Sequence, residues 1–463
     1  MNFTEPRFAA FFAIVFLLYW LLKPNLWRKC LLVGCSYAFY AAWDWRFLSL
    51  LWISTIVDFV AAQRIEASAR HRRLWLILAL TCNFGMLGFF KYFHFFADSL
   101  AQLLGMPLSR TTLNVILPAG ISFYTFHTVS YTVDVYRKNY RAERSFVDYA
   151  LFVSFFPLLV AGPIIRAAQF LPQLKSAREF AAVNFKPLVV LFLVGYLKKI
   201  VGDVPAPFID AVFSGPQNYD AAALIIGELL FAAQIYCDFS GYSDMAIATA
   251  GLLGYRLPKN FSAPYLASNL PDMWRRWHMS FTSWMRDYVY VSLGGNRTSG
   301  AKADRNTIIT MLLVGLWHGA GWNFVAWGGM HGIGLCVHRH WRACMDRYFG
   351  SYAPPMAVGM LVTFVWVCCV MVFFRAPTFP TAVDFLRGVF VPGHHPDLLP
   401  APSYAYPLFI GMAAIHFANT GFQFDARMSR LPLRWFSLAA ALLLVLALGF
   451  TRPEVRPFIY FQF

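Results

Sequence analysis

Residues 312–323 read LLVGLWHGAGWN and place one histidine, His318, in the middle of an apolar run with glycines on both sides. The surrounding apolar segment, residues 307–338, is too long for one simple membrane crossing, because a crossing helix needs about 20 residues. A broken helix at membrane depth is tolerated only where protein or a water-filled cavity covers its backbone. This segment therefore predicts a helical membrane protein that encloses a cavity.

The composition of the whole chain agrees with that prediction. Of its 463 residues, 59% are hydrophobic and 13% are charged, whereas soluble chains are about 45–50% apolar and about 25% charged. The net charge is 39 − 23 = +16, which on so apolar a chain indicates a basic cytoplasmic face and not a nucleic-acid partner. A secreted disulfide scaffold, a disordered tail and a cytosolic enzyme are excluded. None of the eight cysteines has zinc-site spacing, so no metal site is expected.

We expect an all-α polytopic membrane protein with about 10–11 spanning helices, some of them broken or re-entrant, around a central tunnel. The segment 147–174 is expected to dip into the membrane. No internal repeat or linker is found, which predicts one domain over 1–463 with N-terminal spans (1–112), a catalytic core (about 113–345) and C-terminal spans (346–463). The candidate spans are 8–22, 30–42, 47–62, 74–93, 113–133, 187–204, 221–237, 307–338, 356–374, 404–418 and 435–450.

The charged loops predict the orientation of the chain. The first apolar run lacks a basic leader and a small-residue cleavage site, so we expect it to be retained as the first span, with the N-terminus outside. Clusters of arginine and lysine at 64–73 and 137–144 are expected to face the cytoplasm. The loops at 94–112, 205–220 and 376–403 carry few positive charges and are expected to face outward.

Ionisable residues at membrane depth are functional candidates by default, because burying them in hydrocarbon is unfavourable. His318 titrates near neutrality and could take a proton from an attacking hydroxyl. His331 lies thirteen residues later among further glycines and is a second candidate. The alternative for both is a packing histidine that is hydrogen-bonded to a neighbouring helix.

A second region, residues 271–288, has the pattern of an amphipathic interfacial helix. At 100° per residue, one face carries the rings of Trp274, Trp277, Phe281, Trp284 and Tyr288, and the other carries Arg275, Arg276, Ser283 and Arg286. His278 lies at the edge of the aromatic face, about 40° from Trp274. A membrane anchor alone would explain the helix, but it would not require an inward-facing histidine.

A third cluster, residues 237–244, contains Asp238, Ser240, Tyr242 and Asp244 at what reads as the end of an apolar helix. These groups could orient a donor, bind a cation or bridge neighbouring helices. No nucleotide-binding loop, serine-hydrolase elbow or zinc-protease motif is present. Three classes remain: a membrane acyltransferase with a buried histidine, a metal-dependent lipid-linked glycosyltransferase that uses Asp238 and Asp244, and a transporter with broken helices. Loss of activity on chelation would favour the glycosyltransferase.

At these residues the chain resembles the membrane-bound O-acyltransferase family, in particular its bacterial branch of alginate O-acetyltransferase membrane subunits. Two positions depart from the usual pattern, with Ser292 in place of a proline and His127 in place of a common glutamine. The blocks that carry the resemblance are Ser122–Phe126, Asp134–Arg137, Phe155–Arg166, Asp238–Ala246, Asn260–Phe261, Pro264–Leu266, Trp274–His278, Arg286–Tyr288, Leu293–Arg297 and Leu316–Gly319.

The resemblance implies transfer of an acetyl group from a cytoplasmic thioester, acetyl-CoA or an acyl-carrier protein, with no bound cofactor or metal. It places His318 as the catalytic base or hydrogen-bonding group, and His278 as the histidine that positions the thioester or the acceptor. The further candidates for lining the tunnel are Trp317, Asp238, Ser240, Tyr242, Asp244, Trp274, Arg275, Arg276, Asn323 and His331.

The resemblance also implies a setting. On this resemblance the chain is expected to be a multi-pass protein of the inner membrane, surrounded by lipid. Its expected partners are a periplasmic SGNH-type acetyltransferase and the polysaccharide synthesis and export machinery. The acceptor is expected to be an exopolysaccharide such as alginate or cellulose, with peptidoglycan as the alternative.

Overall fold

A computed structural model describes residues 2–105, 115–159, 162–350, 354–391, 398–421 and 424–450, together with residues 456 and 458. Within these residues every regular element is a helix, and the one strand-like contact is an isolated parallel bridge between Tyr219 and Leu399. The expected all-α class is confirmed. The chain forms two compact units, residues 1–188 with 245–258 and residues 189–244 with 259–463; the single-domain organisation stays a prediction.

The first unit contains α1 (Pro6–Leu21), α2 (Asn25–Asp44), η1 (Trp45–Phe47), α3 (Leu48–Ala67), α4 (Arg72–Leu87), η2 (Gly88–Tyr92), α5 (Phe93–Leu104), α6 (Ile121–Tyr136), α7 (Phe146–Ser154), α8 (Phe156–Leu159), α9 (Ala167–Leu174) and η3 (Phe180–Ala182). Two helices contribute residues to both units, α10 (Phe185–Asp203) and α12 (Ala221–Leu252).

The second unit contains α11 (Ala206–Ser214), η4 (Pro216–Asn218), η5 (Pro264–Leu266), α13 (Leu270–Arg276), α14 (Met279–Met285), η6 (Arg286–Tyr290), α15 (Gly300–His318), α16 (Trp322–Phe349), α17 (Met356–Arg375), α18 (Phe379–Phe390), α19 (Ala405–Gly421), α20 (Phe424–Ser429) and α21 (Leu433–Gly449).

Several of these helices can cross a membrane. Four helical stretches are long and apolar enough, namely 25–67, 72–104, 221–252 and 356–375, and three shorter apolar helices accompany them, Pro6–Leu21, Ala405–Ala414 and Leu433–Gly449. A polytopic membrane protein is thereby confirmed, while the number of crossings stays a prediction.

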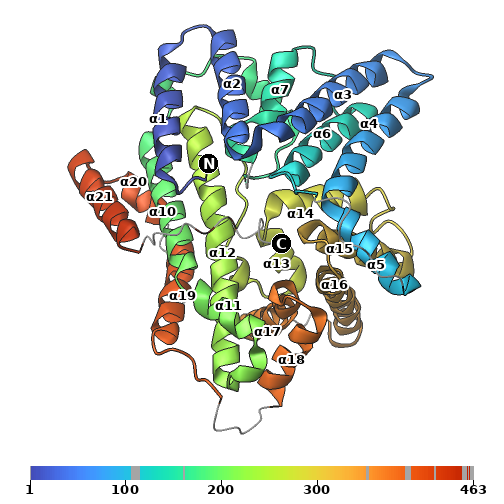
Figure 1. The fold of residues 1–463 in the computed structure, drawn as a ribbon, viewed down its shortest axis with the longest axis vertical. Coiled ribbons are helices and arrows are strands. Elements are labelled where there is room, and N and C mark those ends of the chain that lie inside the picture. The colour runs from blue at the N-terminus through green and yellow to red at the C-terminus, as the bar shows by residue number, and fades with distance from the viewer. Residues whose placement is uncertain are drawn as a thin grey trace. The chain divides into compact units, whose positions relative to one another are not determined.

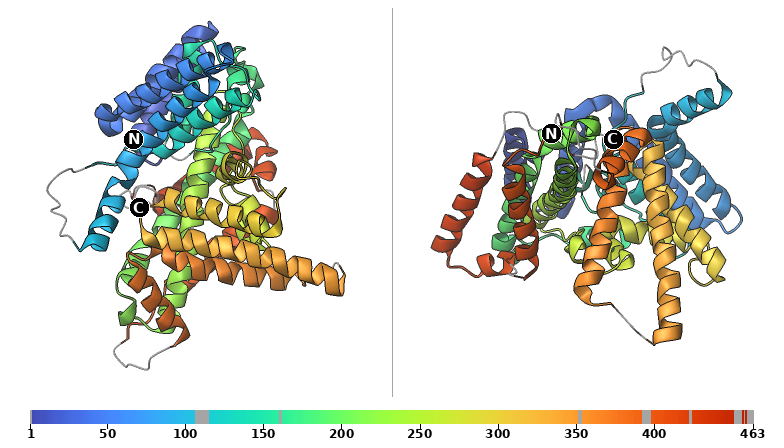
Figure 2. Two further views of the ribbon diagram at one scale, coloured as in Figure 1. Left: turned by 90° about the vertical axis from the view of Figure 1, so that its right-hand side faces the viewer. Right: turned by 90° about the horizontal axis from the view of Figure 1, so that it is seen from below.

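In the first unit α3, α4 and α6 pack side by side (Figures 1 and 2). A buried polar network joins them: the amide of Asn83 on α4 and the hydroxyl of Thr132 on α6 both donate to the carboxyl group of Asp58 on α3. Polar groups in an apolar bundle need such partners, because each unsatisfied group there is strongly destabilising. The segment 147–174, which was predicted to dip into the membrane, forms three short helices, α7 to α9, and none of them is long enough to cross a membrane. Val160 and Ala161, which belong to the block at 155–166, lie outside the described residues.

In the second unit the apolar segment 307–338 is broken, as predicted, between α15 and α16. The two helices then pack along each other (Figure 2). Glycine allows this close approach: a Cβ atom on Gly315 would overlap the carbonyl oxygen of Phe324, and one on Gly328 would overlap that of Met311. The close packing of the two helices therefore depends on a glycine-lined contact that no larger residue permits.

Three sequence predictions need correction. Residues 237–244 do not end a helix but lie inside α12, since lysines on α10 neutralise their carboxylates, as described below. Each stretch expected to be an outward loop contains a helix: α5 within 94–112, α11 within 205–220 and α18 within 376–403. Residues 106–112 and 392–397 of those stretches lie outside the described part. The sidedness of all three stays a prediction.

The third correction concerns the helix expected over 271–288. It is interrupted between α13 and α14, where His278 adopts left-handed backbone angles of φ 42° and ψ 53°. Four rings of the predicted aromatic face, Trp274, Trp277, Phe281 and Trp284, are nevertheless buried, whereas Tyr288 is half-buried. On the other face, Arg275 and Arg286 are exposed.

Candidate functional site

His318 is the last residue of α15, directly before the break. Gly319 adopts an extended backbone, and a Cβ atom there would overlap the ring of Phe324 in α16. This glycine therefore ends one helix and lets the next begin close by, which fixes the position of His318. The carbonyl end of a helix favours positive charge by about 0.3–1 kcal/mol, so the location suits a histidine that acquires a proton.

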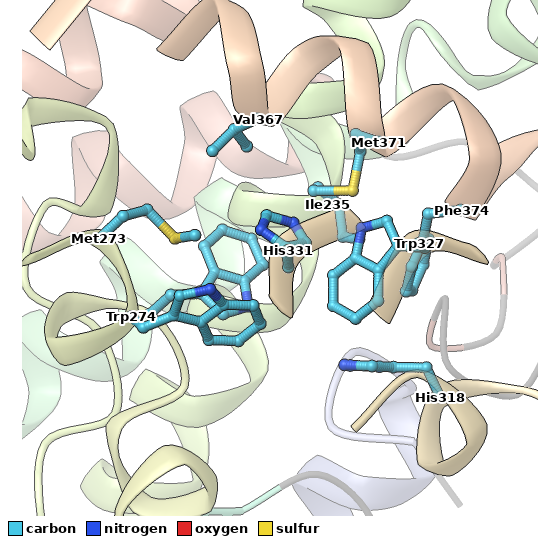
Figure 3. Close-up of a pocket in the computed structure, with 10 residues that line it drawn as sticks. Ile235, Met273, Trp274, His318, Trp327, His331, Val367, Met371 and Phe374 are labelled. Carbon is cyan, nitrogen blue, oxygen red and sulfur yellow. The ribbon is translucent and has the colours of Figure 1, made fainter. Parts of the chain in front are cut away.

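The imidazole of His318 is 3% exposed and lies among aromatic rings. Its centroid is 4.8 Å from the ring of Trp317, 4.9 Å from that of Trp327 and 5.2 Å from that of Phe374. It lines a cavity of about 10 Å³ (Figure 3), which is close to the space that one water molecule needs. The ten residues around the cavity are Ile235, Met273, Trp274, Trp277, His318, Trp327, His331, Val367, Met371 and Phe374.

His331 lines the same cavity from α16. It is 1% exposed, and its ring lies 5.2 Å from Trp274 and 4.8 Å from Trp327 (Figure 3). Its Nδ1 atom has no hydrogen-bond partner among the residues described. The break between α15 and α16 therefore brings together two histidines that the sequence offered as separate candidates.

His278 is fully buried, and α13 and α14 on either side of it are too short to span a membrane. Its ring packs 4.5 Å from Phe239, 4.9 Å from Phe281 and 5.6 Å from Trp317. Neither ring nitrogen has a hydrogen-bond partner in the described part of the chain. Burial lowers the pKa of this imidazole well below its ordinary value, so the ring is neutral.

Two stacked rings connect His278 with His318. The centroids of Phe281 and Trp317 are 4.1 Å apart, and each of these rings also contacts both histidines. His278 does not line the cavity of His318, so the stacked pair separates them. Phe281 was recognised in the sequence only as part of an apolar face, because its role depends on a contact with a residue 36 positions away in the chain.

A larger cavity of about 550 Å³ lies beside this site. Trp274 lines both cavities, while Phe281 and Met311 contribute apolar wall to the larger one. Its basic residues come from α13, η6 and α16 and are Arg275, Arg286, His338, Arg339 and Arg342. Of these, only Arg275 was a candidate from sequence. The signal for Arg286 was its place on the polar face of the segment 271–288, whereas His338, Arg339 and Arg342 lie at or just beyond the end of the apolar segment 307–338.

The acidic cluster of α12 is paired with lysines of α10. Lys199 lies 2.6 Å from the carboxylate of Asp238 with both side chains almost fully buried, and Lys198 lies 2.7 Å from that of Asp244. Gly241 allows the two helices to meet, since a Cβ atom there would lie 2.6 Å from the carbonyl oxygen of Gly195. The sequence signal for this bridge is a pair of lysines, Lys198 and Lys199, in an apolar span.

Several candidates lie away from the cavities described here. Ser240 and Tyr242 are buried in α12, Asn323 donates to the carbonyl of Ala376 at 2.8 Å, and Arg276 pairs with Asp272 at 2.9 Å. None of these residues lines a described cavity, and neither Asp238 nor Asp244 does. A search of the described residues finds no group of three or more side chains that could hold a metal ion.

The known proteins to which this chain is similar are named as enzymes of acyl transfer. The model of the membrane-bound O-acyltransferase family matches residues 37–377. The probable alginate O-acetylase AlgI of Azotobacter vinelandii is 40% identical over 84% of this chain and 78% of its own, and that of Pseudomonas aeruginosa is 38% identical over 84% and 75%. The peptidoglycan O-acetyltransferase of Helicobacter pylori is 36% identical over 84% and 79%.

Proposed function

Since this chain belongs to the membrane-bound O-acyltransferase family and is therefore an acyltransferase of a membrane, we propose that it acetylates an extracytoplasmic polysaccharide from a cytoplasmic thioester. The observation that carries the proposal is the junction of two cavities at Trp274, one holding His318 and the other walled by arginines. That arrangement offers a buried base on one side and a cationic binding wall on the other.

The transfer step is assigned to His318. Its neutral imidazole accepts the proton of an attacking hydroxyl while the hydroxyl oxygen bonds to the thioester carbonyl carbon. The carbon–sulfur bond then breaks, and the proton passes to the departing sulfur, which leaves an acetate ester and a free thiol. The imidazolium that forms in between is stabilised by the carbonyl end of α15, at which His318 lies.

The larger cavity is assigned to the thioester donor. Acetyl-CoA and the prosthetic arm of an acyl-carrier protein both carry phosphate groups, which arginine binds through charge-assisted hydrogen bonds. Arg275, Arg286, Arg339 and Arg342 supply four guanidinium groups around an apolar wall that suits a pantetheine chain. Trp274 lines both cavities, so the acyl end of the donor and the base at His318 meet at this ring.

The other histidines are assigned positioning roles. His331 shares the cavity of His318, and its Nδ1 atom lacks a partner among the described residues, so it can hydrogen-bond the acyl oxygen or the acceptor. His278 lies across the Phe281–Trp317 pair and sets the placement of those rings beside His318. The paired Asp238 and Asp244 are assigned to bridging α10 and α12.

The names of the relatives support a proposed setting. We place the protein in the inner membrane as the subunit that carries acetyl groups outward, with a periplasmic SGNH-type acetyltransferase and the polysaccharide export machinery as partners. The relatives named as probable alginate O-acetylases favour an alginate-type exopolysaccharide as acceptor. The similarity to a peptidoglycan O-acetyltransferase supports peptidoglycan as the second candidate.

Ester-linked acetate measured on isolated polymers tests this proposal. A deletion strain should lose acetate from the exopolysaccharide and keep it on peptidoglycan, and the wild-type gene should restore it. Loss from peptidoglycan alone would support the second candidate. Unchanged acetate on both polymers would contradict the proposal.

A further inference from the structure

A third cavity, of about 310 Å³, lies in the second unit between α12, η5, α17 and α19. This volume is at the lower end of the range for ligand pockets, about 300–1,000 Å³. The cavity shares no residue with either cavity of the proposed transfer site. Its walls are Leu229, Ala232, Ala233, Tyr236, Cys237, Tyr265, Met360, Leu361, Phe364, Phe409, Met412, Ala413, His416 and Phe417.

Small side chains leave this space open. Ala232 and Ala233 on α12 and Ala413 on α19 line it where larger residues would fill it. Two of its apolar lining residues are exposed, Leu361 on α17 at 64% and Phe417 on α19 at 57%. Both α12 and α17 are apolar enough to cross a membrane, so an opening bordered by these side chains meets lipid hydrocarbon and not water.

One histidine stands in this largely apolar wall. His416 is only 7% exposed, and neither of its ring nitrogens has a hydrogen-bond partner among the described residues. Its ring lies 4.6 Å from that of Tyr236 and 5.5 Å from that of Tyr265. The hydroxyl of Tyr265 is already used, since it donates to the carbonyl of Ala232 at 2.6 Å.

A buried imidazole with no hydrogen-bond partner in the described part of the chain indicates a group that binds there, because buried polar groups in native proteins are nearly always hydrogen-bonded. A neutral imidazole offers one donor and one acceptor. In a cavity that opens to hydrocarbon, the ligand must present an apolar chain together with an oxygen that accepts a hydrogen bond. We propose that this cavity binds one acyl chain of a membrane glycerophospholipid, with its ester carbonyl accepting a hydrogen bond from His416.

The test uses the full-length protein and a phosphatidylglycerol with a photoreactive diazirine in one acyl chain. Irradiation followed by peptide mass spectrometry should place the label on the cavity-lining segments of α12, α17 and α19. Ala413→Phe fills the cavity and should remove most of that labelling. Ile410→Phe is the matched control, because Ile410 lies on the same helix, is 66% exposed and does not line the cavity.

His416→Phe keeps a ring but removes both nitrogens, and it supplies the second readout. Losing one hydrogen bond should weaken competition by unlabelled phosphatidylglycerol about 2- to 12-fold. Equal labelling of the Ala413→Phe and Ile410→Phe variants would overturn the proposal. So would displacement of the label by acetyl-CoA, which would assign the cavity to the thioester donor, or unchanged competition in folded His416→Phe protein.

Discussion

At the scale of single residues, three buried histidines differ in what surrounds them. His318 and His331 line one cavity, whereas His278 lies behind the Phe281–Trp317 pair. His318 alone of the three ends a helix at its carbonyl end, where positive charge is stabilised. These different surroundings give His318 and His278 different expected effects of substitution on acetyl transfer.

Replacing His318 by alanine should abolish O-acetylation while the protein still inserts in the membrane. Removal of a positioned general base slows a reaction by about 10²- to 10⁴-fold. Acetate esters on the polymer, measured against membrane protein level, provide the readout. His71→Ala, at an exposed loop histidine, is the control and should be fully active; wild-type acetylation in the His318→Ala strain would end the assignment.

His278→Ala should also impair transfer severely, and its left-handed backbone makes a companion variant informative. A non-glycine residue in this conformation carries strain of about 1–3 kcal/mol, which His278→Gly would relieve. If the ring positions the reacting groups, both variants lose activity, although the glycine variant is at least as stable as the alanine variant. Normal activity in His278→Gly protein would instead make the residue structural.

At the scale of elements, the contact between α15 and α16 determines where His318 and His331 meet. Gly315 and Gly328 pass each other's helix backbone so closely that any side chain there forces the helices apart. Interiors packed this tightly respond to an added methyl group with strain of about 1–3 kcal/mol. The cavity that both histidines line depends on this spacing.

Gly328→Ala should therefore lower thermal stability and reduce acetyl transfer together. Gly329→Ala is the matched control, because its new Cβ atom would lie 3.4 Å from the flexible side chain of Leu312. Thermal unfolding of the purified variants and acetate per polymer provide the two measurements. Equal thermal stability and equal acetate per polymer in the two alanine variants would show that the helix contact does not determine stability or acetyl transfer.

The arginines of the larger cavity come from three elements and are expected to act on donor binding. Arg275→Ala should raise KM for acetyl-CoA about 10-fold or more, since charge-assisted hydrogen bonds contribute about 1.5–3 kcal/mol, while kcat changes less. Its neighbour Arg276 is paired with Asp272 and does not line the cavity. Arg276→Ala should keep the KM of the wild type; the reverse order of effects would contradict the assignment.

At the scale of the whole molecule, the basic loops predict which side of the membrane each end of the helices faces. Within the first unit, Arg144 pairs with Glu66 at 2.6 Å and Arg72 donates to the carbonyl of Tyr136 at 2.5 Å. The loops at 64–73 and 137–144 therefore lie at the same end of that unit. Both are expected to be cytoplasmic, as their positive charge indicates.

Cysteines introduced as Arg70→Cys and Arg141→Cys test this topology. An impermeant thiol reagent should label both only after the cells are opened. The exposed native cysteines, Cys30 and Cys344, must first be replaced, and the cysteine-depleted chain without new thiols is the background control. Labelling of either position in intact cells would reverse the predicted orientation.

Most helices could be predicted from sequence because apolar length and charge are local properties. The break after His318 follows from glycines in an overlong apolar run, and the structure has it where expected. The break at His278 could not be predicted, since its left-handed backbone goes with a ring packed against Phe239, far away in the chain. The length of α12 was missed because the lysines that neutralise its carboxylates lie on another helix.

By itself the sequence determined that this is a helical membrane protein, that its apolar segment around His318 is broken, and that its charged loops are basic. These properties depend on neighbours along the chain. Only the tertiary structure decided that His331 shares the cavity of His318 and that the arginines form one wall beside Trp274. It also decided that His416 is buried with no hydrogen-bond partner among the residues that the structure describes. Such outcomes depend on contacts between residues from separate helices, and the distances between them are set by how the helices pack.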